Sequence, residues 1–227
     1  MKSCLFALAL SVLLIAPVRS QEIVTADRFL QMVSEHYATI RDYEASIVVR
    51  SGNSVMPGTV SYLAPSSLRI DFTQPANQVI LFNGDMLTVF VPGPPPFVLN
   101  QSVAQNRAFA GANLASAEGL NLLRRNYVPT FVTGPEPVSL EANSHEQVVK
   151  LRLVRRNVAE GFREIILSVN PNTNMIRRIV GTTIAGVNVQ FDFTNVRVNQ
   201  GIPEMRFVYT PPAGANTIHN FMFRDMN

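Results

Sequence analysis

The sequence predicts a mainly β protein, in which a single curved antiparallel sheet forms an unclosed β-barrel with a helical lid. Apolar and polar residues alternate in several segments, most clearly at 68–73 and 187–194. A period of two is typical of a strand with one buried and one solvated face. Two segments with helical spacing, one near the N-terminus and one in the middle of the chain, would cover the apolar face.

The first 20 residues predict a signal peptide. Lys2 provides the positive start, an apolar stretch follows up to Val18, and small residues precede a cleavage point after Ser20. The chain's one cysteine, Cys4, would leave with this segment. The mature chain, residues 21–227, is predicted to be a single domain without disulfides, which favours the periplasm.

A helix is predicted to open the mature chain. Thr25 can cap its N-terminus, and Asp27 in its first turn complements the helix dipole. Apolar residues recur on one side of it, namely Phe29, Met32, Val33 and Tyr37.

About nine or ten strands are predicted from the alternation and from the turn residues between the runs. Asn83-Gly84-Asp85 and the segment 170–174 are the clearest turns. The expected strands are 45–50, 59–62, 68–73, 79–82, 86–91, 149–153, 165–169, 176–183, 187–194 and 205–209.

The middle of the chain interrupts the strands. Proline donates no ladder hydrogen bond, so the run 92–97 cannot lie inside a sheet. It fits either an exposed apolar loop for a membrane partner or a stiff connector into the lid. The alanine- and leucine-rich segment 101–126 predicts a helical insert, with Ser116 as a cap.

Two architectures fit this pattern. A single antiparallel layer, polar outside and apolar inside, would curve around a cavity that the helices cover. Alternatively, two sheets would pack face to face as a β-sandwich and fill one another's apolar faces.

Charge and motifs argue against several functions. The net charge is +3, and it falls to +1 without Lys2 and Arg19. Arginines alternate with acidic residues, so no dense basic face for nucleic acid is expected. His36, His145 and His219 are widely separated and show no metal-ligand spacing. Without a Gly-x-Ser-x-Gly elbow or a phosphate loop, we predict no enzyme, no metal and no cofactor.

Two parts of the chain resemble the outer-membrane lipoprotein carrier family, the LolA-like periplasmic chaperones. The first is Gly58-Thr59-Val60-Ser61-Tyr62-Leu63-Ala64-Pro65, continued by 68–75 and 83–92. The second is Phe191-Asp192-Phe193-Thr194-Asn195-Val196, continued by 202–203 and 207–214. The resemblance implies an unclosed barrel with a helical lid. It also implies a periplasmic monomer that takes acylated lipoproteins from an inner-membrane transporter to an outer-membrane acceptor.

One position departs from the family pattern. Well-known members have an arginine before the proline that corresponds to Pro65, where it hydrogen-bonds the lid. This chain has Ala64 there, which has no side-chain donor. Arg69 alternates onto the face opposite Leu68 and Ile70, so it is not expected to replace that arginine.

The predicted acyl-binding wall consists of inward-facing apolar residues: Tyr62, Leu68, Ile70, Phe72, Phe90, Leu151, Ile165, Leu167, Val189, Phe191 and Phe193. The predicted lid residues are Phe29, Met32, Val33, Leu120, Leu122 and Leu123. For each of these residues the alternative is ordinary core packing. Other functions that fit the pattern are a carrier of another acylated lipid, a periplasmic acyl-chain sensor and a hydrolase of acylated substrates.

Overall fold

The structure, a computed structural model, describes residues 24–102, 115–157 and 161–220. The predicted signal peptide and part of the predicted helical insert, residues 103–114, lie outside these ranges. The helices are α1 (Ala26–Ala38) and α2 (Ala117–Asn126), and Glu204–Phe207 forms a 3₁₀ turn. The strands are β1 (Asp42–Ser51), β2 (Ser54–Leu63), β3 (Ser67–Phe72), β4 (Val79–Phe82), β5 (Met86–Val91), β6 (Phe97–Ser102), β7 (Tyr127–Phe131), β8 (Val138–Ser139), β9 (Gln147–Arg155), β10 (Phe162–Val169), β11 (Ile176–Thr183), β12 (Asn188–Val198) and β13 (Asn216–His219).

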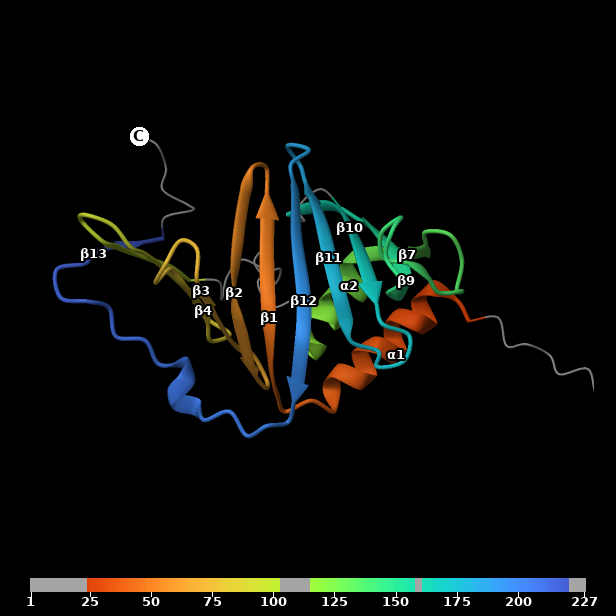
Figure 1. Cartoon of the computed structure of the whole chain (residues 1–227), viewed down its shortest axis with the longest axis horizontal. Coiled ribbons are helices and arrows are strands. Elements are labelled where there is room, and N and C mark those ends of the chain that lie inside the picture. The colour runs from red at the N-terminus through yellow and green to blue at the C-terminus, as the bar shows by residue number, and fades with distance from the viewer. Residues whose placement is uncertain (1–23, 103–114, 158–160, 221–227) are drawn as a thin grey trace, which may run out of the picture.

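These strands form one curved sheet in the order β13-β6-β5-β4-β3-β2-β1-β12-β11-β10-β9-β7, with β8 beside β9 (Figure 1). β13 joins β6 in parallel, and the neighbours from β6 to β7 are antiparallel. The two end strands, β13 and β7, do not pair with each other within the described residues. The predicted single unclosed sheet is therefore confirmed, and the β-sandwich alternative is wrong.

The two faces of the sheet follow from its register, because directly opposed residues share a face. Ile47 of β1 lies between Gly58 of β2 and Phe193 of β12. Ile47 and Phe193 belong to the main apolar cluster together with residues of α1 and α2. We call this side the inner face and the opposite side the outer face.

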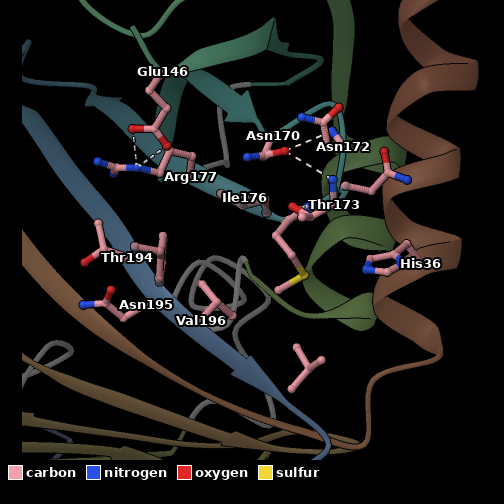
Figure 2. A pocket seen from close by; sticks show the side chains of 14 residues that line it. His36, Glu146, Asn170, Asn172, Thr173, Ile176, Arg177, Thr194, Asn195 and Val196 are labelled. Atoms are coloured by element: carbon pink, nitrogen blue, oxygen red, sulfur yellow. Dashed lines mark hydrogen bonds and ion pairs between the residues drawn. The ribbon is translucent and has the colours of Figure 1, made fainter. Parts of the chain in front are cut away.

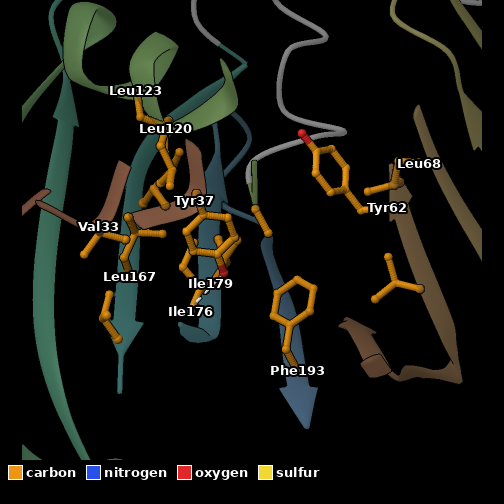
Figure 3. Packing of buried hydrophobic residues seen from close by; sticks show 14 of the residues in the cluster. Val33, Tyr37, Tyr62, Leu68, Leu120, Leu123, Leu167, Ile176, Ile179 and Phe193 are labelled. Atoms are coloured by element: carbon orange, nitrogen blue, oxygen red, sulfur yellow. Dashed lines mark hydrogen bonds between the residues drawn. The ribbon is translucent and has the colours of Figure 1, made fainter. Parts of the chain in front are cut away.

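Both helices lie against the inner face (Figure 1). Thr25 caps α1 and Ser116 caps α2, as predicted, and each accepts a hydrogen bond from a backbone N–H in the first turn. Leu30 and Val33 of α1 and Leu120 of α2 are fully buried in the main cluster (Figure 3). Helix formation here thus rests on an apolar stripe that the sheet covers.

The outer face of β3–β6 is covered by residues 199–219, which we call the C-terminal strap. The strap leaves the end of β12, contacts β3 through its 3₁₀ turn and ends as β13 beside β6 (Figure 1). At its start, the buried carboxylate of Asp42 accepts hydrogen bonds from the backbone N–H groups of Gln200 and Gly201, at 2.7 and 3.1 Å. Charge-assisted bonds of this kind are the strong ones, so Asp42 fixes the direction of the strap.

Arg69 holds the middle of the strap. Its guanidinium donates to the backbone carbonyl oxygens of Arg206 and Val208 and to the carboxylate of Asp71. Arg206 in turn donates to Asp71 at 2.6 Å. Arg69 therefore lies on the outer face, as its alternation predicts, and it stabilises the strap rather than the helices.

Several local predictions are wrong. The expected strand 205–209 is replaced by the 3₁₀ turn and extended residues of the strap. The proline run 92–97 joins β5 to β6, so it is not a connector into the lid, whereas contact with a membrane partner stays a prediction. β6, β7, β8 and β13 were not predicted, because short or irregular sequence runs carry little periodicity.

Candidate functional site

The inner face of the sheet is the candidate site, because it is a continuous apolar surface that reaches from β6 to β7. All predicted wall residues except Phe90 lie on it, as the register of neighbouring strands requires. They are Tyr62, Leu68, Ile70, Phe72, Leu151, Ile165, Leu167, Val189, Phe191 and Phe193.

The prediction that Phe90 belongs to the acyl-binding wall is wrong. It is opposed to Val79 on the outer face and packs against Tyr209 of the strap, with ring centroids 5.6 Å apart. Together with Leu81 and Val98 it forms a second, smaller apolar cluster under the strap. β5 carries apolar residues on both faces, so alternation could not show which face binds the helices.

The predicted lid residues divide into three groups. Val33, Leu120 and Leu123 are buried in the main cluster, and their role in a lid stays a prediction. Phe29 and Leu122 are partly buried, and the ring of Phe29 contacts Phe131 of β7 at 6.0 Å between centroids. Met32 points to solvent with 38% of its surface exposed, so its prediction is wrong. Leu30 is completely buried, so Leu30 and not Met32 belongs to the buried side of α1.

Three tyrosines line the junction between α1 and the central strands. The ring of Tyr43 stacks on that of Tyr62 at 5.1 Å and meets the edge of Tyr37 at 6.5 Å. Their hydroxyls bind backbone: Tyr43 donates to the Ala115 carbonyl, Tyr62 donates to the Pro65 carbonyl, and Tyr37 accepts from the Ile176 N–H. Burial raises the pKa of all three phenols, so they stay neutral hydrogen-bonding groups at ordinary pH.

The tyrosine contacts bear on the position of Ala64, where the family pattern has an arginine. Tyr43 lies on the inner face of β1, and its hydroxyl reaches Ala115 immediately before the cap of α2 at 3.1 Å. A hydrogen bond from the sheet to the start of α2 is thus present in this chain, and a neutral phenol on another strand makes it. No sequence pattern pointed to this contact, because it joins residues that are 72 positions apart.

The inner face has two different halves. Under the helices, Leu151, Leu153 and Leu167 of β9 and β10 are completely buried. Leu167 is labelled in Figure 3. In the half formed by β2–β6, Val60, Leu68 and Phe72 are buried as well. Other inner-face residues of this half remain partly exposed, among them Met56, Ile80 and Val89. We call these the covered half and the open half.

A cavity of about 650 Å³ lies at the edge of the covered half (Figure 2). It is lined by the end of α1, by the β10–β11 turn with its asparagines, and by β12 from Phe193 to Val198. Its volume is in the range of small-molecule sites, which combine an apolar surface with a few polar groups.

Charges beside this cavity are paired with one another. Asp192 of β12, whose side chain is 7% exposed, meets Arg50, Arg177 and Arg178. Burial alone would raise the pKa of Asp192, but hydrogen bonds from Gln190 and Arg178 and the neighbouring positive charges outweigh burial and lower it. Glu141 and Glu146 bind the same arginines from the loop before β9. The network therefore joins β1, β11, β12 and this loop.

The described residues contain no group of three His, Cys, Asp or Glu side chains that could hold a metal ion. Nor does any helix in the described ranges have the length and hydropathy to cross a membrane.

The family model of the outer membrane lipoprotein carrier protein LolA matches residues 48–210 of this chain. The chain belongs to the LolA family. A search of curated proteins found no match.

Solved structures share the LolA-like fold at low sequence identity. An uncharacterized conserved protein from Thermus thermophilus aligns with a TM-score of 0.54 and 10% identity, over 83% of this chain and 98% of that protein. MucB aligns with a TM-score of 0.51 and 14% identity, over 84% of this chain and 64% of MucB. The Pseudomonas aeruginosa MucA/MucB complex gives a TM-score of 0.49, with 14% identity over 82% of this chain and 61% of the matched one.

Proposed function

We propose that this protein binds the acyl chains of lipoproteins on the inner face of its sheet and carries them from the inner to the outer membrane. The observation that carries the proposal is the open half, where Met56, Ile80 and Val89 leave apolar surface available beside a closed core. Membership of a lipoprotein carrier family supports the choice of ligand.

The energetics suit a carrier rather than an enzyme. Burying a methylene contributes about 0.8 kcal/mol, so even half of a long acyl chain supplies several kcal/mol before the costs of association. Such binding needs no directed chemistry, only a dry apolar surface. A carrier must also release its ligand, which requires a second state of the site with lower affinity.

The helices provide such a second state in this proposal. Leu30, Val33 and Leu120 fill the covered half when no ligand is bound. A bound chain would extend from the open half beneath α1 and α2 and displace them. The hydrogen bond from Tyr43 to Ala115 would hold α2 down until ligand binding offsets its loss.

The cellular setting stays part of the proposal. Cleavage after Ser20 would deliver residues 21–227 to the periplasm as a single-domain monomer. An inner-membrane lipoprotein-releasing transporter would be the donor and an outer-membrane receptor the acceptor.

The test is native mass spectrometry of residues 21–227 purified from the periplasm. Co-purified acylated protein is the expected result. Free phospholipid or glycolipid would instead identify a carrier of another acylated lipid. A chain that stays empty when offered a diacylated lipoprotein contradicts the proposal.

A charge on the inner face sharpens this test. Phe191→Glu places a carboxylate among apolar side chains and is expected to lower the bound fraction at least about tenfold. Val128→Glu adds the same charge on the outer face of β7, where the side chain is exposed, and should bind like the unmodified protein.

A further inference from the structure

We propose that the cavity between the β10–β11 turn and β12 seats the uncharged ester and amide groups at the head of the acylated ligand, with the acyl chain continuing onto the inner face. This inference rests on the proposed function and assigns a separate place to the polar end of the ligand. Four observations support it.

The cavity is an interruption of the sheet. The β11–β12 ladder ends at the pair Arg178 and Asp192, although β12 continues to Val198. The N–H of Ile176, the first residue of β11, donates to the hydroxyl of Tyr37 at 3.1 Å instead of to β12. Tyr37 thus draws the start of β11 towards α1 and keeps the two strands apart.

The bulge in β12 lies beside this gap. Asn195 has a φ of 53°, and the pairing with β1 shifts by one residue between Glu44 and Ser46. A bulge bends its strand and re-aims the side chains next to it. This stretch of β12 therefore differs from a regular edge strand that another strand could extend.

The floor of the cavity belongs to the inner face. Ile176 and Phe193 are buried members of the main apolar cluster, and Met175 and Val196 pack against that cluster. Figure 2 labels Ile176 at the start of β11, next to the asparagine-bearing turn, and Val196 on β12. Phe193 is opposed to Ile47, which is buried, so an acyl chain that leaves the cavity past Phe193 would reach Ile47 once the side chains over it are displaced.

The rim offers neutral hydrogen-bonding groups. Within the described residues, the side-chain amides of Asn172 and Asn174 have no hydrogen-bond partner, and both line the cavity. The charged pair at the rim is already formed, since Arg177 donates to Glu146 at 2.8 and 3.0 Å and to Asp192 at 3.2 Å. An anionic head would have to compete with both carboxylates for Arg177, which leaves it the imidazole of His36 on the α1 side, whereas ester and amide groups can use the free amides.

The experiment compares two ligands that have the same acyl chain and different head groups. Monopalmitoylglycerol is uncharged and palmitate is anionic, and each displaces a fluorescent acyl probe from residues 21–227. We expect monopalmitoylglycerol to bind at least about tenfold tighter than palmitate, a difference that one or two hydrogen bonds supply. Equal affinities for the two probes, or tighter binding of palmitate, would overturn the inference.

Two variants locate the head. Val198→Arg, at a rim residue that is 37% exposed, should weaken monopalmitoylglycerol about tenfold, whereas Val154→Arg on β9, 39% exposed, should not. Asn174→Gly removes one rim amide, and glycine tolerates the φ of 53° found there, so a change in probe preference reports the amide rather than strain.

The outcomes separate the two proposals. If Val198→Arg and Asn174→Gly both behave like the unmodified protein while Phe191→Glu abolishes binding, the head does not lie in this cavity and the carrier function stands. If the unmodified protein binds neither probe nor diacylated lipoprotein, the carrier function and the head site are both wrong.

Discussion

The covered and open halves of the inner face are built from the same kinds of residue but differ in what lies over them. In the covered half, Leu151 and Leu167 are sealed by α1 and α2. In the open half, Ile80 and Val89 occupy equivalent inward positions and stay partly exposed. The open half thus combines buried residues, such as Leu68 and Phe72, with partly exposed ones, and only the latter leave apolar surface available.

The outer face shows the opposite distribution. There the C-terminal strap covers the side of β3–β6 that backs the open half, burying Val79, Phe90 and Val98. The sheet is thus stabilised by helices on one side of one half and by the strap on the other side of the other half. In this arrangement Ile80 and Val89 of the open half stay partly exposed on the inner face, although their neighbours Leu68 and Phe72 are buried there.

The largest expected effect is in the core of the covered half. Leu167→Ala removes a completely buried side chain and should lower the free energy of unfolding by about 3 kcal/mol. Ile80→Ala, in the open half, should lower it by about 1 kcal/mol, because less of that side chain leaves water on folding. Urea denaturation of both variants gives the two values. Equal losses would show that the halves do not differ.

The ion pairs behind the covered half give the next effect. Asp192→Asn removes the carboxylate that three arginines surround and should cost about 2 kcal/mol near neutral pH, less than a fully buried pair because Arg50 is partly exposed. The folded pKa of Asp192 lies below its ordinary value of 3.8, so its contribution is complete above that pH and is lost as the pH falls through the folded pKa.

Denaturation curves between pH 7 and pH 2 test this sign. The stability difference between the unmodified protein and Asp192→Asn should be constant down to about pH 5 and then shrink. A difference that grows on acidification would mean that the pKa of Asp192 is raised and that burial outweighs the arginines.

A smaller effect is expected at the contact between the sheet and α2. Tyr43→Phe removes the hydrogen bond to the Ala115 carbonyl and should cost about 1 kcal/mol while leaving ring packing on Tyr62 in place. If this bond holds the helices over the covered half, hydrogen exchange of α2 amides should accelerate. Tyr62→Phe is the matched control, because its hydroxyl binds Pro65 within the sheet's own loop.

The smallest effect is expected at the start of α1. Thr25→Ala removes a cap whose oxygen accepts from the Arg28 N–H at 3.2 Å at an exposed helix end, which should cost about 0.5 kcal/mol. Thermal denaturation followed by circular dichroism measures it. Thr25→Ser keeps the acceptor and should retain the original stability.

Much of the fold could be predicted because its signals are local. The alternation at 68–73 and 187–194 corresponds to β3 and β12, and Thr25 and Ser116 cap the helices that were expected after them. A period of two can be recognised from a few neighbouring residues alone. The family resemblance at 58–65 and 191–196 agrees with the family model that matches 48–210.

The features that the sequence did not predict have one cause in common. Phe90 and Val89 are both apolar, so alternation could not show that Phe90 faces the strap. Met32 and Leu30 are both reasonable core residues on a helix, and only the crossing of α1 over the sheet selects Leu30. The cavity beside β12 depends on Tyr37 meeting Ile176, 139 positions away, which has no periodic signature.

The sequence by itself determined strands with one apolar face and two capped helices, because hydrophobic periodicity and capping act over a few residues. That these strands form one layer and not a sandwich was decided by the tertiary structure. The tertiary structure decided which half of that face is covered, where the strap lies and where the sheet opens beside Asn195. Those features arise from contacts between distant segments, whose free energy depends on shape and burial that no local pattern contains.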